Sequence, residues 1–165
     1  MEDGSQSEGL QGAVSSNLSV VFLNFFSHLY IADLLTFSSF AIDVMVLSGA
    51  GKAFCSGYDL AHYASSDGPN KVVQDMPWDP MQDFQFMWRN TQAFMSLFRA
   101  MRPVICKVHG FAVAGGSDIA LCADMIVMGD DAKIGYMPTR VWGCPTTAMW
   151  VHRLGPEKAK RMMFT

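Results

Sequence analysis

The sequence predicts an α/β protein in which parallel strands alternate with helices. Three short runs rich in β-branched and apolar residues, at 42–48, 104–108 and 125–128, are typical of strands in a parallel sheet. Between the first two runs, apolar residues recur at helical spacing over 83–101, and the glycine pair at 115–116 opens a second predicted helix. Strand, helix, strand, helix, strand in this order favours a parallel sheet with intervening helices.

Local signals set the ends of these elements. The first predicted strand ends at the glycines of 49–51, and a proline-rich loop is expected over 64–80. The helix at 83–101 stops before Pro103, since proline does not continue a helix. The second strand ends at His109, where a glycine follows. We find no internal sequence repeat.

Composition limits the class of protein. The chain has 165 residues, 50% of them hydrophobic and 16% charged, which fits one folded domain and excludes disorder of the whole chain. The net charge is −3, so the sequence has no excess of basic residues that would indicate nucleic-acid binding. No CxxC spacing is present, so we predict no metal and expect free thiols in a reducing compartment at the four cysteines 55, 106, 122 and 144.

The N-terminal part differs from the rest. Residues 1–51 contain five acids and no Lys or Arg, and 1–17 read as a disordered tail. The atypical apolar segment 18–41 lacks the basic residues of a secretory or mitochondrial leader. Its apolar spacing favours a buried or partner-facing helix, and a membrane helix is the less favoured alternative because polar residues interrupt it. We expect an intracellular protein, cytoplasmic by default, with mitochondria and peroxisomes left open.

Two glycine-containing segments, 53–60 and 108–120, each follow a predicted strand. Small residues let a ligand approach backbone N–H groups closely, and the second segment also opens a helix with unpaired N–H groups. Two such N–H groups converging on one oxygen make an oxyanion hole; the alternative is glycine used only for tight turns. The segment around Lys52 lacks the glycine and Ser/Thr positions of a phosphate-binding loop, which favours a simple turn.

Five motifs occur in the order found in the crotonase (enoyl-CoA hydratase/isomerase) superfamily. They are VLSGAGKAFCSGYDL at 46–60, RPVI at 102–105, GFAVAGGSD at 110–118, CADM at 122–125 and RLG at 153–155. Residues 42–165 therefore resemble the central ββα spiral core of that family, without its N-terminal strands and C-terminal helices. The resemblance implies a homotrimer or hexamer where the full architecture is present. Without the C-terminal cover, the apolar faces of 84–101 and 142–164 are expected to be exposed.

The resemblance also implies a site for acyl-CoA. In this family the thioester carbonyl lies between two backbone N–H groups, which correspond here to Tyr58 and Gly115. CoA enters as part of the thioester substrate, and no metal or redox cofactor is implied. The resemblance assigns the CoA path to the backbone around Ala53, Ser56, Gly57, Asp59 and Leu60.

Hydratases of the family use two glutamates, and this sequence departs at both positions. The first corresponds to Asp118, which is either a general base or an acid favoured by the helix dipole. The second corresponds to Thr139, whose hydroxyl does not titrate near neutral pH. Beside it, Arg140 either binds a substrate carboxylate or is a surface or ion-paired residue. His109 and His62 are acid/base candidates, with structural roles as the favoured alternative.

These observations favour an acyl-CoA-binding enzyme that stabilises a thioester enolate, similar to enoyl-CoA hydratases and isomerases. The alternative is a catalytically silent crotonase-like protein that binds CoA or subunits. Thr139 and the segments that do not match the family favour this alternative.

Overall fold

A computed structural model describes residues 18–23, 43–58, 74–141 and 143–165, and for 18–23 the backbone alone. The predicted tail at 1–17 lies outside the described residues. In chain order the elements are β1 (Leu18–Leu23), β2 (Val44–Gly49), α3 (Pro80–Phe98), β3 (Val104–Val108), β4 (Phe111–Val113), α4 (Gly115–Cys122), β5 (Met125–Met128), β6 (Lys133–Gly135), the 3₁₀ helix η1 (Met137–Arg140) and α5 (Met149–Phe164).

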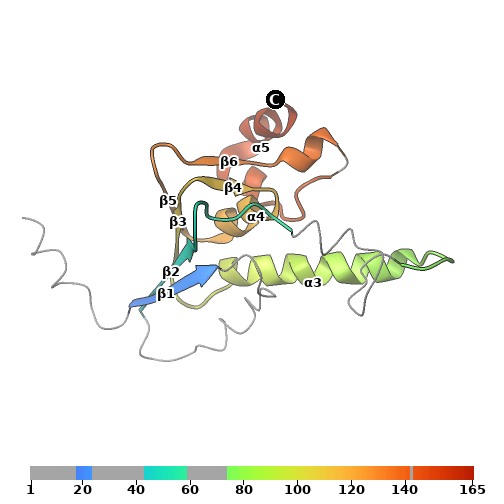
Figure 1. The fold of residues 1–165 in the computed structure, drawn as a ribbon, viewed down its shortest axis with the longest axis horizontal. Coiled ribbons are helices and arrows are strands. Elements are labelled where there is room, and N and C mark those ends of the chain that lie inside the picture. Colours follow the sequence, from blue (N-terminus) through green and yellow to red (C-terminus); the bar gives the residue numbers. More distant parts are fainter. Residues whose placement is uncertain (1–17, 24–42, 59–73, 142) are drawn as a thin grey trace, which may run out of the picture.

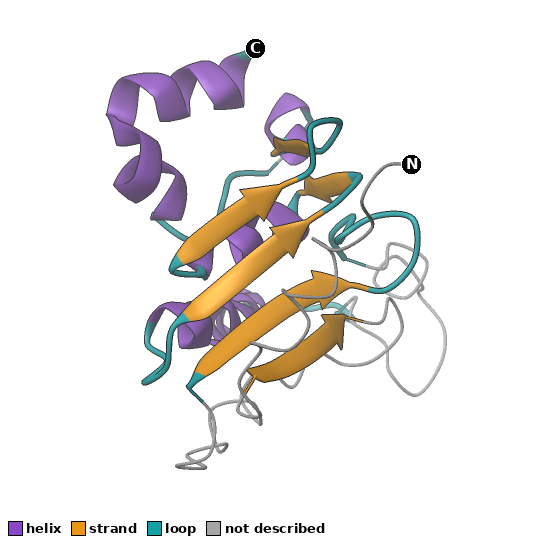
Figure 2. Ribbon diagram, turned by 90° about the vertical axis from the view of Figure 1, so that its left-hand side faces the viewer, coloured by secondary structure: helices purple, strands orange, loops and turns teal. Residues whose placement is uncertain are grey.

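The larger sheet contains four parallel strands in the order β1-β2-β3-β5. Its register places Met45 opposite Val104 and Ile105 opposite Met125. Figure 2 shows the four strands pointing the same way, with the helices behind and to one side. The predicted class, parallel strands with intervening helices, is therefore confirmed.

A second, smaller sheet pairs β4 with β6 in parallel, and Cys55 extends it through a bridge to Ala112. The chain therefore repeats one pattern, in which a strand of the large sheet is followed by a strand of the small sheet and then by a helix. The order β3, β4, α4 is one copy and β5, β6, η1, α5 is the next (Figure 1). This structural repeat has no counterpart in the sequence.

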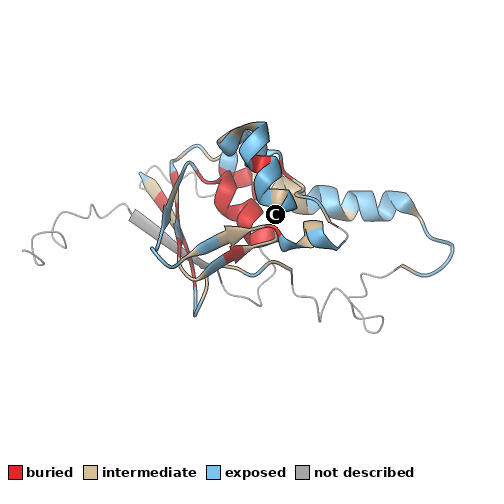
Figure 3. Cartoon of the chain, turned by 90° about the horizontal axis from the view of Figure 1, so that it is seen from above, coloured by how far each residue is buried: buried red, intermediate tan, exposed pale blue. Residues whose placement is uncertain are grey.

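The core lies on one face of the large sheet. In β3, Val104, Cys106 and Val108 are buried, whereas Lys107 between them is exposed, as expected for a half-buried strand. All eight residues of α4 are buried in this core (Figure 3). The α5 residues Met149 and Trp150 complete it.

Helix α3 begins and ends three residues earlier than the predicted 83–101. Asp79 is the N-cap, its side chain accepting the Met81 N–H at 2.9 Å, and Pro80 occupies the first helical turn. Proline suits that position because its missing N–H would have no intrahelical acceptor. Pro80 falls within the predicted loop 64–80, so the predicted start of the helix is three residues too late.

The helix predicted for the apolar segment 18–41 is wrong over Leu18–Leu23. These residues form β1, paired in register with β2 from Leu18 opposite Val44 to Leu23 opposite Gly49. The sheet pairing prevails over the local apolar spacing, and 24–42 lie outside the described residues. Within the described part of the chain, no helix has the length and apolar character needed to cross a membrane.

Candidate active site

The two glycine-containing segments predicted from the sequence lie next to each other. The Cys55 N–H donates to the Phe111 carbonyl at 3.0 Å, and the Val113 N–H donates to the Cys55 carbonyl at 3.0 Å. These bonds attach the chain after β2 to β4. As a result, Gly57, two residues after Cys55, and Ala114, directly after β4, meet at the start of α4.

Their approach is too close for a side chain on Gly57. A Cβ added there would lie 2.9 Å from the Ala114 Cβ and 3.5 Å from the Gly115 nitrogen. Gly57 also has a φ of 100°, a conformation that glycine adopts without the steric cost of a side chain. At Gly115 an added Cβ would be 3.9 Å from the Gly57 Cα and 3.9 Å from Tyr58 Cε2. The Gly57 backbone and the Tyr58 side chain therefore lie beside the first turn of α4.

The start of α4 holds the one non-glycine residue with positive φ among the described residues. Ala114 has φ 52° and ψ −127°, a sparsely populated conformation that costs about 1–3 kcal/mol. It is held there because its N–H donates to the Gly135 carbonyl at 3.1 Å and its carbonyl accepts the Ser117 N–H at 3.0 Å. The next residue, Gly115, is the first of the helix, so its N–H has no intrahelical acceptor.

Asp118 lies in the first turn of the same helix and is 1% exposed. Its Oδ1 accepts the Thr147 hydroxyl at 3.1 Å, and the Thr146 backbone also hydrogen-bonds to it. Burial raises the pKa of Asp118 to about 6, and the bonds from Thr147 and Thr146 oppose that rise. The carboxyl therefore exchanges a proton close to neutral pH, which suits a general acid or base.

Sequence reasoning missed Thr146 and Thr147 because they are far from Asp118 in the chain and match no spacing rule. It also missed Tyr136, a buried residue whose hydroxyl donates to the Cys144 carbonyl at 3.0 Å. Burial raises the pKa of Tyr136, and the negative charge of Asp118 raises it further. Tyr136 therefore stays protonated and acts as a neutral hydrogen-bond donor.

Thr139 lies in η1, where its hydroxyl is 2.8 Å from the Tyr136 carbonyl oxygen and 2.8 Å from that of Met163. Its single proton is shared between two backbone acceptors, so the side chain joins η1 to the end of α5. This placement favours a structural role. The exposed Arg140 next to it donates to the Thr165 carbonyl.

The other predicted site residues fall in three groups. Ala53 and Gly57 are half-buried and Ser56 is exposed, all on the segment bridged to β4. His109 Nε2 is 2.9 Å from the Gly51 carbonyl oxygen, a contact that supports its structural role. Asp59, Leu60 and His62 lie outside the described residues. No group of three potential metal-ligating side chains occurs in the described ranges.

Comparison with known proteins defines the class. The family model described as enoyl-CoA hydratase/isomerase matches residues 30–165, so the match begins upstream of residue 42, where we expected it to start. This chain belongs to the enoyl-CoA hydratase/isomerase family, the crotonase superfamily.

Relatives match over about half of their own length. The chain is 28% identical over 129 residues to a carnitinyl-CoA dehydratase of Proteus mirabilis, covering 76% of this chain and 44% of that protein. It is 26% identical over 129 residues to a crotonyl-CoA hydratase of Syntrophomonas wolfei, covering 76% and 45%. The crystal structure of an enoyl-CoA hydratase from Mycobacterium smegmatis matches with a TM-score of 0.76 at 37% identity, over 92% of this chain and 57% of that one.

Proposed function

We propose that this chain binds acyl-CoA thioesters and polarises the thioester carbonyl between the backbone N–H groups of Tyr58 and Gly115. The observation that carries this proposal is the contact between their segments, where an added Gly57 Cβ would lie 3.5 Å from the Gly115 nitrogen. The Gly115 N–H is also at the positive end of the α4 dipole. Negative charge that develops on the thioester oxygen is stabilised at that point.

Asp118 is the proposed proton carrier of this site. It follows Gly115 by three residues, so both lie in the first turn of α4. With a pKa near 6, its ionised form accepts a proton from a water in hydration or from the substrate γ-carbon in isomerisation, and its protonated form returns one to the α-carbon. The bonds from Thr147 and Thr146 hold the carboxyl group in one orientation. The proposed reaction is hydration or isomerisation of a 2-enoyl-CoA.

The first experiment measures binding and turnover of crotonyl-CoA together on the full chain. Binding is followed by calorimetry, and turnover by loss of the absorbance of the conjugated thioester. Asp118→Asn should reduce turnover by about 10²–10⁴-fold and leave binding nearly unchanged. The matched control is Asp130→Asn, which alters an exposed carboxyl group and should change neither. Unchanged turnover in Asp118→Asn would remove this residue from the mechanism.

A second pair of variants tests the oxyanion site. Gly115→Pro deletes the N–H at a helical position that accepts proline, and should lower turnover by about 10²–10³-fold. Gly115→Ala keeps the N–H, and its Cβ would come no closer than 3.6 Å to its neighbours. The alanine variant should keep most of the turnover. Equal loss of turnover and binding in both variants would contradict an oxyanion role.

One observation favours a silent acyl-CoA-binding protein as the second candidate. Thr139, at the position of the second family carboxylate, has its hydroxyl engaged by the Tyr136 and Met163 carbonyls. Binding of crotonyl-CoA and of other enoyl-CoA thioesters without turnover would favour this candidate. The predicted homotrimer or hexamer remains to be tested by sedimentation of the same preparation.

A further inference from the structure

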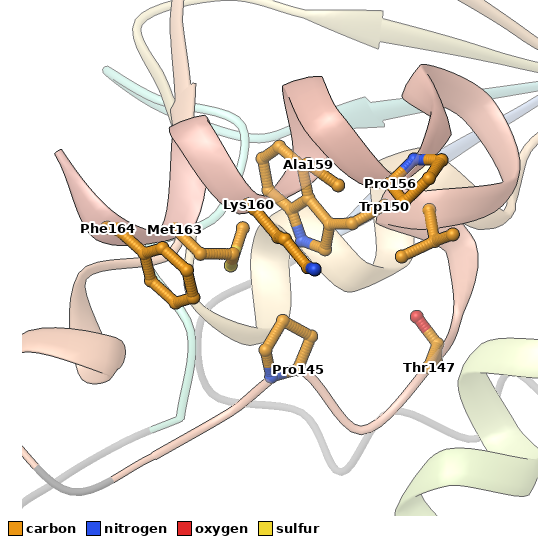
Figure 4. A pocket seen from close by; sticks show the side chains of 9 residues that line it. Pro145, Thr147, Trp150, Pro156, Ala159, Lys160, Met163 and Phe164 are labelled. Atoms are coloured by element: carbon orange, nitrogen blue, oxygen red, sulfur yellow. The ribbon is translucent and has the colours of Figure 1, made fainter.

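A pocket of about 230 Å³ lies between helix α5 and the segment that precedes it (Figure 4). The helix changes direction at Gly155, whose φ of 74° and ψ of 163° are not helical. Its two halves therefore face the same space from different directions. The pocket is lined by Pro145, Thr147, Trp150, Val151, Pro156, Ala159, Lys160, Met163 and Phe164.

One wall of this pocket contains an unsatisfied hydrogen-bond donor. Trp150 is 3% exposed, and its indole Nε1 has no hydrogen-bond partner. Figure 4 shows the indole nitrogen on the side of the ring that faces Pro145, within the space bounded by the labelled side chains. An unpaired buried N–H costs about 1–3 kcal/mol, so a buried tryptophan N–H normally has an acceptor. A ligand in the pocket would supply that acceptor.

The other lining groups define the chemistry of such a ligand. Lys160 is the one ionisable side chain among the nine, and Figure 4 shows its ammonium nitrogen turned into the same space. The Thr147 hydroxyl donates its proton to Asp118, so toward the pocket it offers only a lone pair. The remaining lining side chains are apolar. The pocket thus combines two donors, one of them cationic, with an apolar wall.

We propose that this pocket binds a short aliphatic carboxylate. The carboxylate lies between the Trp150 indole N–H and the Lys160 ammonium, and the hydrocarbon chain lies against Val151, Met163 and Phe164. The volume is below the roughly 300–1,000 Å³ of pockets that hold drug-sized ligands, which favours a short hydrocarbon chain. This site involves neither Tyr58 nor Gly115, and it adjoins the proposed thioester site through Thr147, which lines the pocket and donates to Asp118.

The test titrates the full chain with hexanoate, 1-hexanol and hexylammonium by calorimetry. These ligands share one hydrocarbon chain and differ in the charge of the polar group. Hexanoate should bind at least about tenfold more tightly than either of the others, because a hydrogen bond to a charged acceptor is worth more than one to a neutral acceptor. Equal affinity for the three, or no binding of hexanoate, would overturn the proposal.

Variants locate the binding to this pocket. Trp150→Phe keeps an aromatic ring and removes the N–H, and should weaken hexanoate binding by about tenfold. Lys160→Met should weaken hexanoate several-fold and leave hexanol unchanged. Lys158→Met is the matched control, since Lys158 is exposed and does not line the pocket. Thermal melting confirms that each variant folds. Hexanoate binding that is unchanged in both Trp150→Phe and Lys160→Met would overturn this site.

Discussion

Helices α3 and α4 contact each other, yet their surroundings differ sharply. All eight residues of α4 are buried, whereas only Phe94, Ser96 and Leu97 are buried among the 19 residues of α3. Figure 3 shows α4 within the core and most of α3 extending beyond it. The large side chains of Phe84 and Trp88 are 62% and 54% exposed.

This difference in burial shows that the apolar pattern of α3 and the glycines of α4 carry different information. The apolar face of α3 is strongly patterned, but pattern alone does not show whether a partner surface is present. The expected exposure of apolar side chains on 84–101 and 142–164 is confirmed at positions such as Phe84, Phe98 and Phe164. In α4, by contrast, glycine permits close backbone contact at Gly116, and the functional candidates Gly115 and Asp118 lie in the same helical turn.

The largest expected effect comes from the buried end of α3. Phe94→Ala should lower the free energy of unfolding by about 4 kcal/mol, because Phe94 is 5% exposed and its loss leaves a cavity in the core. Phe84→Ala on the same helix should change it by less than about 0.5 kcal/mol. Chemical denaturation measures both. Similar losses in the two variants would show that the exposed half of α3 is covered in solution.

Asp118→Asn should remove a pH dependence of stability that originates in α4. Burial raises the pKa of Asp118 from 3.8 to about 6, so the folded state holds this proton more tightly than the unfolded chain. The stabilisation is fully present below pH 3.8 and is lost as the pH rises through about 6. At about 1.4 kcal/mol per pKa unit, the loss is on the order of 3 kcal/mol.

Denaturation of wild type and Asp118→Asn at several pH values between these limits measures this effect. The difference in unfolding free energy between the two proteins should change across that interval in favour of the variant as pH rises. A constant difference would mean that Asp118 titrates alike in the folded and unfolded states.

Adjacent glycines of α4 provide a matched test of the close contact. Gly116→Ala would place a Cβ 2.3 Å from the Cys55 carbonyl oxygen and 2.8 Å from its Cβ, and should destabilise by roughly 2 kcal/mol. Gly115→Ala meets nothing closer than 3.6 Å and should alter stability by less than about 1 kcal/mol. Equal effects of the two substitutions on the denaturation midpoint would contradict the packing of α4 against Cys55.

Thiol reactivity gives the smallest perturbation and compares the interior of α4 with the surface. Cys144 is exposed and should react first with a thiol reagent. Cys122 is buried, and burial raises its pKa to about 12, with the charge of Asp118 adding to the rise. It should react only after unfolding. Cys144→Ser should therefore remove the fast phase, which mass spectrometry of the labelled protein would detect.

Much of the large sheet was predictable from local patterns. The runs predicted at 104–108 and 125–128 are strands β3 and β5, and the predicted first strand is β2 with a shift of its ends. Strands β4 and β6 were missed because each has three residues, too few to show a periodic pattern. Strand β1 was misread because its pairing with β2 is a long-range contact.

The site divides in the same way. The glycine-containing segments after two strands indicated close backbone approach around Gly57 and Gly115, and the family resemblance assigned their roles in the site. The hydrogen bond from Thr147 to Asp118 joins two residues that are 29 positions apart in the chain, so no local sequence pattern predicts it. The backbone acceptors of Thr139 could not be read from the sequence for the same reason.

The sequence by itself determined the α/β class, the family resemblance and the pair of segments that carry the candidate oxyanion donors. These depend on residue type, order and short-range spacing. The tertiary structure decided that Asp118 is buried with a raised pKa, that Ala114 holds a strained conformation and that Trp150 faces a pocket without a partner. Burial, strain and unpaired donors arise from distant segments packing together, and that packing is set only when the chain folds.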